Sequence, residues 1–137
     1  MKQRMLIVLA SGAVSLTLGA GLTFAHHSVA ATYLVGKSVK IEGTLKEFVW
    51  RNPHSFMRVE APDDKGEKHL WIIEGAAPQQ LTESGLTAST LRPGDRVIIT
   101  GIPGRVAEDH RMLLHTIERP ADGFKWVGPA ANVQGGQ

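Results

Sequence analysis

Residues 39–50, VKIEGTLKEFVW, carry the pattern that decides the fold of this chain. Apolar and polar residues alternate from Val39 to Leu45, which is the period of a strand with one buried face. The phase then changes, because Phe48 and Trp50 are apolar at even positions. A bulge near Glu47, helped by Gly43, would bend such a long strand and move its core face. We therefore expect a strongly curved first strand.

The rest of the pattern predicts four further strands and one short helix. The strands are expected at residues 57–61, 69–74, 96–102 and 111–117. The helix is expected between Pro78, which suits a first helical turn, and Gly85, which suits a C-terminal cap, with Leu81 pointing inward. Residues 92–95 (RPGD) have Pro and Gly where a type II turn prefers them.

This order favours an all-β fold, a small five-stranded OB-like Greek-key barrel with one short helix between the third and fourth strands. A small Greek-key sandwich is the alternative.

Length and composition limit the classes of function. The 137 residues are 42% hydrophobic and 20% charged, which suits one domain. The absence of cysteine excludes thiolate zinc sites, iron–sulfur clusters, disulfides, a cysteine nucleophile and a lipid-modified cysteine.

The N-terminal segment has the three parts of an export signal. Two positive charges precede an uncharged, mostly apolar stretch at residues 6–22, and Thr23-Phe24-Ala25 offers small residues at a cleavage site. An uncleaved membrane anchor is the alternative, although this stretch is short and contains several Gly, Ser and Thr residues. We expect a cleaved signal peptide at 1–25, a barrel domain at 26–120, a flexible tail at 121–137 and a periplasmic location.

Without its signal the chain is electrically neutral. The excess charges Lys2 and Arg4 lie in the signal, and 13 basic and 13 acidic residues follow from position 26. A neutral domain lacks the basic surface of a nucleic-acid binder. We expect no nucleic-acid partner, no stable membrane anchor and a monomer.

Histidines supply the strongest chemical signal. Cleavage after Ala25 would expose His26-His27 at a free amino terminus, where the α-amine, amide and imidazole nitrogens form a chelate that suits copper(II). His54 follows Asn52-Pro53 on a turn that ends the first strand, and it is the candidate for a further imidazole ligand. His54 capping the turn through a backbone group is the alternative.

Other polar and aromatic residues are weaker candidates. Four residues are predicted to line a ligand-binding surface or to support the metal ligands: Trp50, Arg51, Trp71 and Glu74. Core packing is the alternative for the tryptophans that lie in alternating strands. Glu74 is expected to pair with Arg58 or Arg96, or to lie at the barrel mouth as a binding carboxylate.

The remaining histidines fit structural or solvated roles. We expect His69 to share a strand face with Trp71, His115 to share one with Leu113 and Ile117, and His110 to be solvated in a charged loop.

Signs of catalysis are poor. The sequence has no nucleophile-elbow motif, no phosphate-binding glycine loop and no convincing pair of catalytic carboxylates. We expect no enzymatic activity.

Several short motifs together resemble a family of small exported bacterial proteins of unknown function. The motifs are His26-His27-Ser28, Trp50-Arg51-Asn52-Pro53-His54, Trp71-Ile72-Ile73-Glu74, Pro78-Gln79-Gln80-Leu81 and Leu91-Arg92-Pro93-Gly94-Asp95. The last has Arg where that family has Lys. The resemblance covers about residues 26–120 and implies export and a small β-barrel, but no activity.

A looser similarity links Trp50, His54 and Met57 to periplasmic OB-fold copper and silver chaperones, in a different order and spacing. The sequence therefore predicts a non-enzymatic periplasmic protein that binds a transition metal, copper above all, through His26, His27 and His54. The alternative is a metal-free OB-fold module that binds a small ligand, a glycan or another periplasmic protein through the Trp50, His54 and Trp71 surface.

Overall fold

The computed structural model describes residues 29–129. Residues 29–32 are helical and fall in a unit separate from the barrel, which begins at Tyr33. The barrel elements are β1 (Val39–Val49), β2 (Phe56–Pro62), β3 (Lys68–Glu74), α2 (Pro78–Glu83), β4 (Arg96–Pro103), the 3₁₀ turn η1 (Ala107–Asp109), β5 (Arg111–Arg119) and β6 (Phe124–Val127). Among the described residues, no helix has the length and apolar character needed to span a bilayer.

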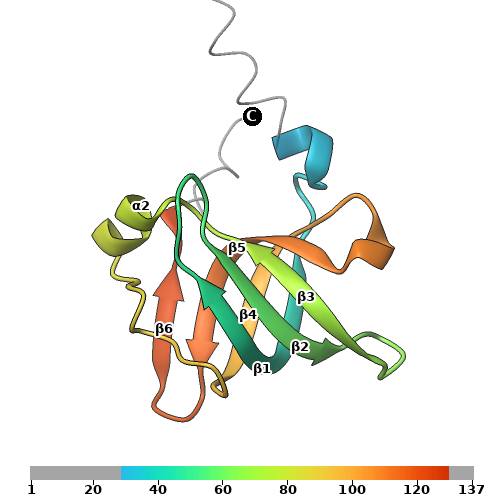
Figure 1. Cartoon of the computed structure of the whole chain (residues 1–137). Helices are drawn as coiled ribbons and strands as arrows, with labels where there is room; N and C mark the ends of the chain where they lie inside the picture. The colour runs from blue at the N-terminus through green and yellow to red at the C-terminus, as the bar shows by residue number, and fades with distance from the viewer. Residues whose placement is uncertain (1–28, 130–137) are drawn as a thin grey trace, which may run out of the picture. The chain divides into compact units, whose positions relative to one another are not determined.

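The strands form one sheet that closes on itself. Their order is β3-β2-β1-β4-β5-β6, and an additional parallel pairing of β3 with β5 closes a five-stranded barrel (Figure 1). The short helix α2 lies between β3 and β4 in the chain. The predicted OB-like barrel is confirmed, and the sandwich alternative is excluded by the pairing of β3 with β5.

Strand β1 is shared between two neighbours. Its first half, residues 39–44, pairs with β4, and its second half, from Thr44 onward, pairs with β2. The register shifts between Leu45 and Glu47, so the predicted bulge is confirmed and lies at Lys46. The type II turn at residues 92–95 lies beside it, because Leu45 N–H donates to Asp95 O at 2.8 Å.

Glycine lets β1 pass close to its neighbour. A Cβ atom placed on Gly43 would lie 2.2 Å from the carbonyl oxygen of Glu60 on β2, far inside van der Waals contact. Any side chain at this position would push the two strands apart. The curvature of β1 therefore depends on both Gly43 and the bulge.

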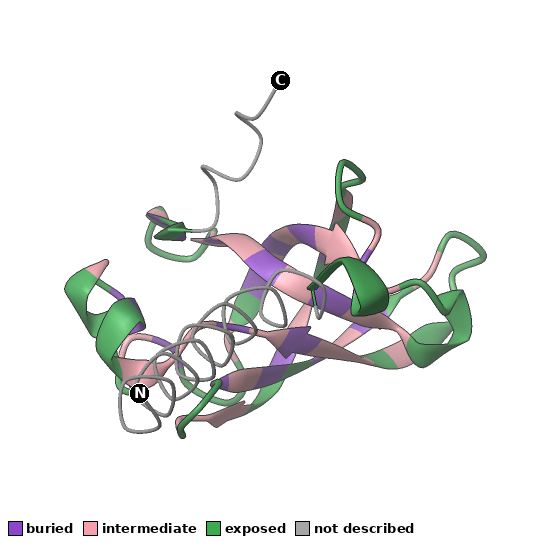
Figure 2. Ribbon diagram, turned by 90° about the horizontal axis from the view of Figure 1, so that it is seen from above, coloured by how far each residue is buried: buried purple, intermediate pink, exposed green. Residues whose placement is uncertain are grey.

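The core fills the barrel interior, as the buried bands of the strands show in Figure 2. The largest fully buried side chains come from all five barrel strands and from the segment around α2: Leu45, Met57, Ile73, Leu81, Leu86, Ile99, Met112 and Ile117. Leu81 points inward as predicted. Met57 is 1% exposed, so its sulfur belongs to the core and not to a surface site for soft metals.

A sixth strand corrects the expected flexible tail at 121–137. Residues Phe124–Val127 form β6 against the end of β5, and Trp126 is 6% exposed with its indole N–H donating to Ser84 O at 3.0 Å. The buried ring of Trp126 holds this short strand against the barrel. The composition of the tail alone did not indicate a strand. Residues 130–137 lie outside the described part.

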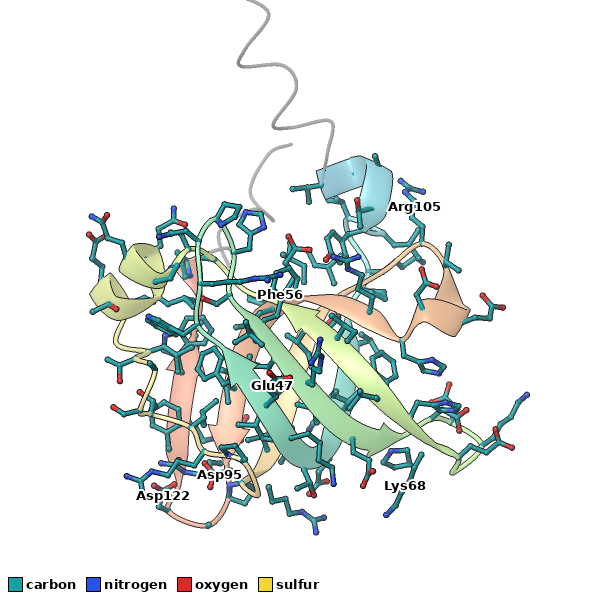
Figure 3. All side chains as sticks on the ribbon, in the orientation of Figure 1. Glu47, Phe56, Lys68, Asp95, Arg105 and Asp122 are labelled. Atoms are coloured by element: carbon teal, nitrogen blue, oxygen red, sulfur yellow. The ribbon has the colours of Figure 1, made fainter. Side chains whose placement is uncertain are left out.

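The turn between β5 and β6 is held by one cation. Arg119 contacts Asp95 at 2.9 Å, Asp122 at 2.8 Å and the carbonyl oxygen of Thr90 at 2.7 Å. Both aspartates are labelled at this end of the barrel in Figure 3. The guanidinium thereby joins the β5–β6 turn to residues 90–95, which are distant in the chain.

A second bulge changes the face of His115. Along β5, Leu114 pairs with Gly101 and Thr116 pairs with Thr100, so His115 is left as the extra residue. Leu114 and Ile117 are buried, whereas His115 is partly exposed. The expected common face of Leu113, His115 and Ile117 is wrong, because a bulge shifts the alternation by one residue.

We predict that Gly43→Ala lowers the free energy of unfolding by about 2–3 kcal/mol, the cost of overpacking a tight contact. Urea denaturation of purified protein measures the change. Gly75→Ala is the matched control, because its Cβ would meet only ordinary contacts at 3.5 Å and beyond. Equal stability of the two variants would contradict the role given to Gly43.

Candidate metal site and carboxylate cluster

The turn between β2 and β3 is organised by Asp63. Its Oδ1 accepts hydrogen bonds from the backbone N–H groups of Lys65 at 2.8 Å and Glu67 at 2.9 Å. Its Oδ2 lies 2.9 Å from Nε2 of His69, the second residue of β3. Partial burial raises the pKa of Asp63, but the backbone donors and His69 outweigh it and hold the pKa below its ordinary value. The carboxylate is therefore fixed through one oxygen and directs the other at His69.

His110 reaches the same place from the loop before β5. Its backbone is in the left-handed region, at φ 45°, which few residues other than glycine adopt. Its Nδ1 lies 2.9 Å from the carbonyl oxygen of Glu108, so this nitrogen carries the proton and Nε2 is left as the electron-pair donor. The ring stacks on His69, with 3.9 Å between centroids and 14° between planes.

Asp63, His69 and His110 together form a ligand set, which we call the Asp63 cluster. One ligand atom from each residue lies within 4.8 Å of those from the other two, and all three residues are partly buried. A cavity of about 290 Å³ adjoins the cluster. It is lined by Val39, Lys40, Ile41, Pro62, Asp63, Asp64, Lys65, Trp71, Ala107 and His110.

A second polar cluster surrounds Glu74 at the end of β3. The carboxylate is 13% exposed and accepts hydrogen bonds from the Tyr33 hydroxyl and from Arg111 at 3.1 Å through Oε2. Its Oε1 lies 2.5 Å from Nδ1 of His54, whose side chain is 51% exposed. The carboxylate fixes the His54 tautomer, so that Nε2 is available on an exposed ring.

Burial and hydrogen bonding compete at this cluster. Burial raises the pKa of Glu74, but the hydrogen bonds from Tyr33 and His54 and the charge of Arg111 outweigh it, so the pKa is lowered. Burial and the hydrogen bond to Glu74 raise the pKa of the Tyr33 hydroxyl above its ordinary value. Glu74 is therefore an anion whose charge is compensated within the fold.

The structure separates several of the predicted site residues. His26 and His27 lie outside the described residues. His54 contacts Glu74, but the expected partners of Glu74 are wrong, because Arg58 pairs with Glu47 and Arg96 pairs with Glu42. These two ion pairs are exposed at the surface. Glu74 lies at the end of β3, where Tyr33, His54 and Arg111 are its partners.

The predicted aromatic residues do not share one surface. Trp50 packs against the core with its ring 5.3 Å from that of Phe48. Trp71 also packs against the core and meets His110 edge to face at 5.2 Å, so it lines the cavity beside the Asp63 cluster. Arg51 lines a separate surface hollow beside Phe56.

Sequence reasoning missed the Asp63 cluster as a site. His69 was expected to be a packing residue and His110 a solvated one, because their spacing matches no metal signature. The only local signal was Asp63 in a hairpin turn six residues before His69. The pairing of β3 with β5 was needed to bring His110 to them.

Comparison with known proteins identifies the family. A model described as a family of unknown function (DUF6152) matches residues 13–112. The chain belongs to this family. No curated protein and no solved structure matches the chain. Membership agrees with the resemblance found in the sequence motifs, and the family supplies no activity.

We predict that Glu74→Gln lowers the free energy of unfolding by about 1–3 kcal/mol at pH 7, because it weakens hydrogen bonds to a charged acceptor. The lowered pKa of Glu74 means that its contribution is complete above the unfolded value of about 4.3. The contribution is lost as the pH falls through the lower, folded value. Urea unfolding between pH 7 and pH 3 should show the two proteins converging at the acid end.

Glu118→Gln is the control for this experiment. Glu118 is 43% exposed and pairs with Lys125 at the surface, so its loss should change stability by about 0.5 kcal/mol or less. A Glu74→Gln difference that stays constant down to pH 3 would contradict the charged role of Glu74.

Proposed function

We propose that this protein binds a divalent transition metal at the Asp63 cluster. The observation that carries the proposal is the convergence of one carboxylate and two imidazoles from separate segments, with ligand atoms within 4.8 Å. Hydrogen bonds already orient two of the three candidate ligands. Asp63 accepts them from backbone N–H groups through Oδ1, and His110 donates one to the Glu108 carbonyl through Nδ1. Such supporting hydrogen bonds are what metal-ligating residues have in known sites.

To hold a metal, the cluster would have to contract, and the stacked rings of His69 and His110 would have to turn toward one point, because an imidazole nitrogen binds a metal in the plane of its ring. Metal–nitrogen and metal–oxygen bonds of about 2.1 Å bring ligand atoms to within about 4.2 Å of one another. The hydrogen bond between Asp63 and His69 would give way to bonds with the metal.

The donor atoms favour particular metals. Two imidazole nitrogens and one carboxylate oxygen suit zinc(II), copper(II) and nickel(II), whereas copper(I) prefers sulfur. The only methionines among the described residues are Met57 and Met112, and both are buried in the core. We propose copper(II) as the first metal to test, since the same preference applies to His26-His27.

Three protein ligands leave a coordination position open. In zinc proteins, three protein ligands with a fourth position open to water or substrate are typical of catalytic sites, and closed four-ligand sites are typical of structural metals. The cavity of about 290 Å³ beside Asp63 and His110 gives such a position access to solvent molecules. The role that we propose is reversible metal binding in the periplasm.

We predict that His110→Ala weakens copper(II) binding at least tenfold, because it removes one ligand of three. Calorimetric titration of the purified protein, carried out in a His26→Ala/His27→Ala background, isolates the barrel site. Electron paramagnetic resonance should show nitrogen ligands that decrease in the variant.

His115→Ala is the matched control, because this histidine lies on β5 outside the Asp63 cluster. His69→Ala should behave like His110→Ala. Equal affinity of the His110 and His115 variants would overturn the proposal, as would the absence of a one-to-one stoichiometry in the background protein.

A second copper(II) site at the N-terminus is tested separately. We predict that protein whose first residue is His26, as established by mass spectrometry, binds one more equivalent than protein carrying an added N-terminal residue. His54→Ala should weaken this second equivalent if its free Nε2 completes the site, and Glu74→Gln should weaken it less. An unchanged second equivalent in the His54 variant would remove His54 from the ligand set.

A further inference from the structure

An apolar strip lies on the outer face of β1, β2 and β3. Three apolar side chains point away from the core and are partly exposed: Val49, Phe56 and Ile72. They alternate along their strands with residues that face the core. Val49 pairs with Phe56 across β1 and β2, and the neighbouring pair Arg58 and Ile72 joins β2 to β3. The register therefore places the three apolar side chains side by side on one exterior surface.

The strip forms the floor of a hollow of about 380 Å³. Its other lining residues are charged: Glu47, Arg51 and Arg58. Figure 3 labels Glu47 and Phe56 on the strands that carry this surface. We call it the Arg51 pocket, after Arg51, which lies two residues beyond the end of β1.

Charges in the Arg51 pocket do not balance. Arg58 donates a hydrogen bond to Glu47, so these two charges compensate each other. The Arg51 guanidinium lies over the Phe56 ring, 5.6 Å from its centroid. Among residues 29–129, no carboxylate lies within ion-pair distance of Arg51. The pocket thus presents one positive charge above an aromatic floor.

Glu74, the acid at the edge of the strip, does not cancel this charge. Glu74 pairs with Phe56 across β2 and β3, but its oxygens are engaged by Tyr33, Arg111 and His54. The carboxylate is therefore held by its own donors at the edge of the strip. Within the described part of the chain, Arg51 therefore has no ion-pair partner, and its guanidinium contacts the Phe56 ring.

We propose that the Arg51 pocket binds a small organic carboxylate with an aromatic or other apolar body. The carboxylate would make a two-pronged contact with the Arg51 guanidinium, whose planar shape matches it. The apolar body would lie on Phe56, Val49 and Ile72 and remove them from water. The site is independent of the Asp63 cluster, which uses different residues and different chemistry.

Three probes separate the two parts of this recognition. Phenylacetate carries both charge and ring, phenylacetamide carries the ring without the charge, and acetate carries the charge without the ring. We expect phenylacetate to shift the backbone amide resonances of Val49, Arg51, Phe56 and Ile72 in NMR spectra, with saturation at about 1 mM. Phenylacetamide and acetate should each bind about tenfold more weakly.

Two arginine variants test the site. Arg51→Gln removes the unpaired charge from an exposed side chain and should weaken phenylacetate binding about tenfold. Arg92→Gln is the control, because Arg92 is an exposed arginine in the turn at residues 92–95, outside the pocket. Phe56→Leu keeps an apolar residue in the strand and should weaken phenylacetate but not acetate.

The outcomes separate cleanly. Loss of affinity in Arg51→Gln with none in Arg92→Gln, and resonance shifts confined to the strip, would support the proposal. Equal binding of phenylacetate and phenylacetamide, equal binding by the two arginine variants, or shifts centred on other residues would overturn it. The copper(II) titration of the Asp63 cluster is unaffected by either result.

Discussion

The hydrogen bond from the N–H of Ile72 to the carbonyl of His110, at 2.9 Å, is the contact on which the rest of this structure depends. It starts the parallel pairing of β3 with β5, and this pairing turns an open sheet into a closed barrel. Closure removes the two edges that β3 and β5 would otherwise expose along these residues. It also brings together two segments that lie more than thirty residues apart in the chain.

Both polar clusters are built on this junction. His110 precedes the first paired residue of β5, so the junction places its ring on that of His69. Arg111 is the next residue, and its guanidinium reaches Glu74 at the end of β3. The candidate metal site and the compensated carboxylate thus lie at two places along the same pair of strands. A metal at the proposed site would bind between segments that the barrel already holds in place. Fewer protein groups would then lose conformational entropy when the metal binds.

Strand β1 provides the curvature that makes closure possible. A straight strand of eleven residues could not pair with β4 along one half and β2 along the other while both neighbours curve around one core. Gly43 lets β2 approach, and the bulge at Lys46 turns the core-facing side chains to a new phase. The same change of phase puts Val49 outside and Phe48 against the core, and so creates the apolar floor of the Arg51 pocket.

Much of the fold could be read directly from the sequence because its signals are local. The alternation in residues 39–50, the RPGD turn and the Pro78 start of α2 each depend on neighbours a few residues away, and each was confirmed. The bulge at His115 and the strand around Trp126 were missed. A one-residue insertion leaves no composition signal, and a short strand held by one buried ring has almost no periodicity.

The sequence by itself determined the succession of strands along the chain, the bent first strand, the position of the helix, the resemblance to the family and the place of His54 beside a turn. Only the tertiary structure decided which side chains meet. Barrel closure brings together the candidate ligands Asp63, His69 and His110. Glu74 pairs with Arg111, whereas Arg58 and Arg96 pair with other acids. Arg51 has no carboxylate partner among the described residues. The physical reason is that local propensity depends on the backbone and its near neighbours. Contacts between side chains depend on barrel closure, which joins residues with no regular spacing in the chain.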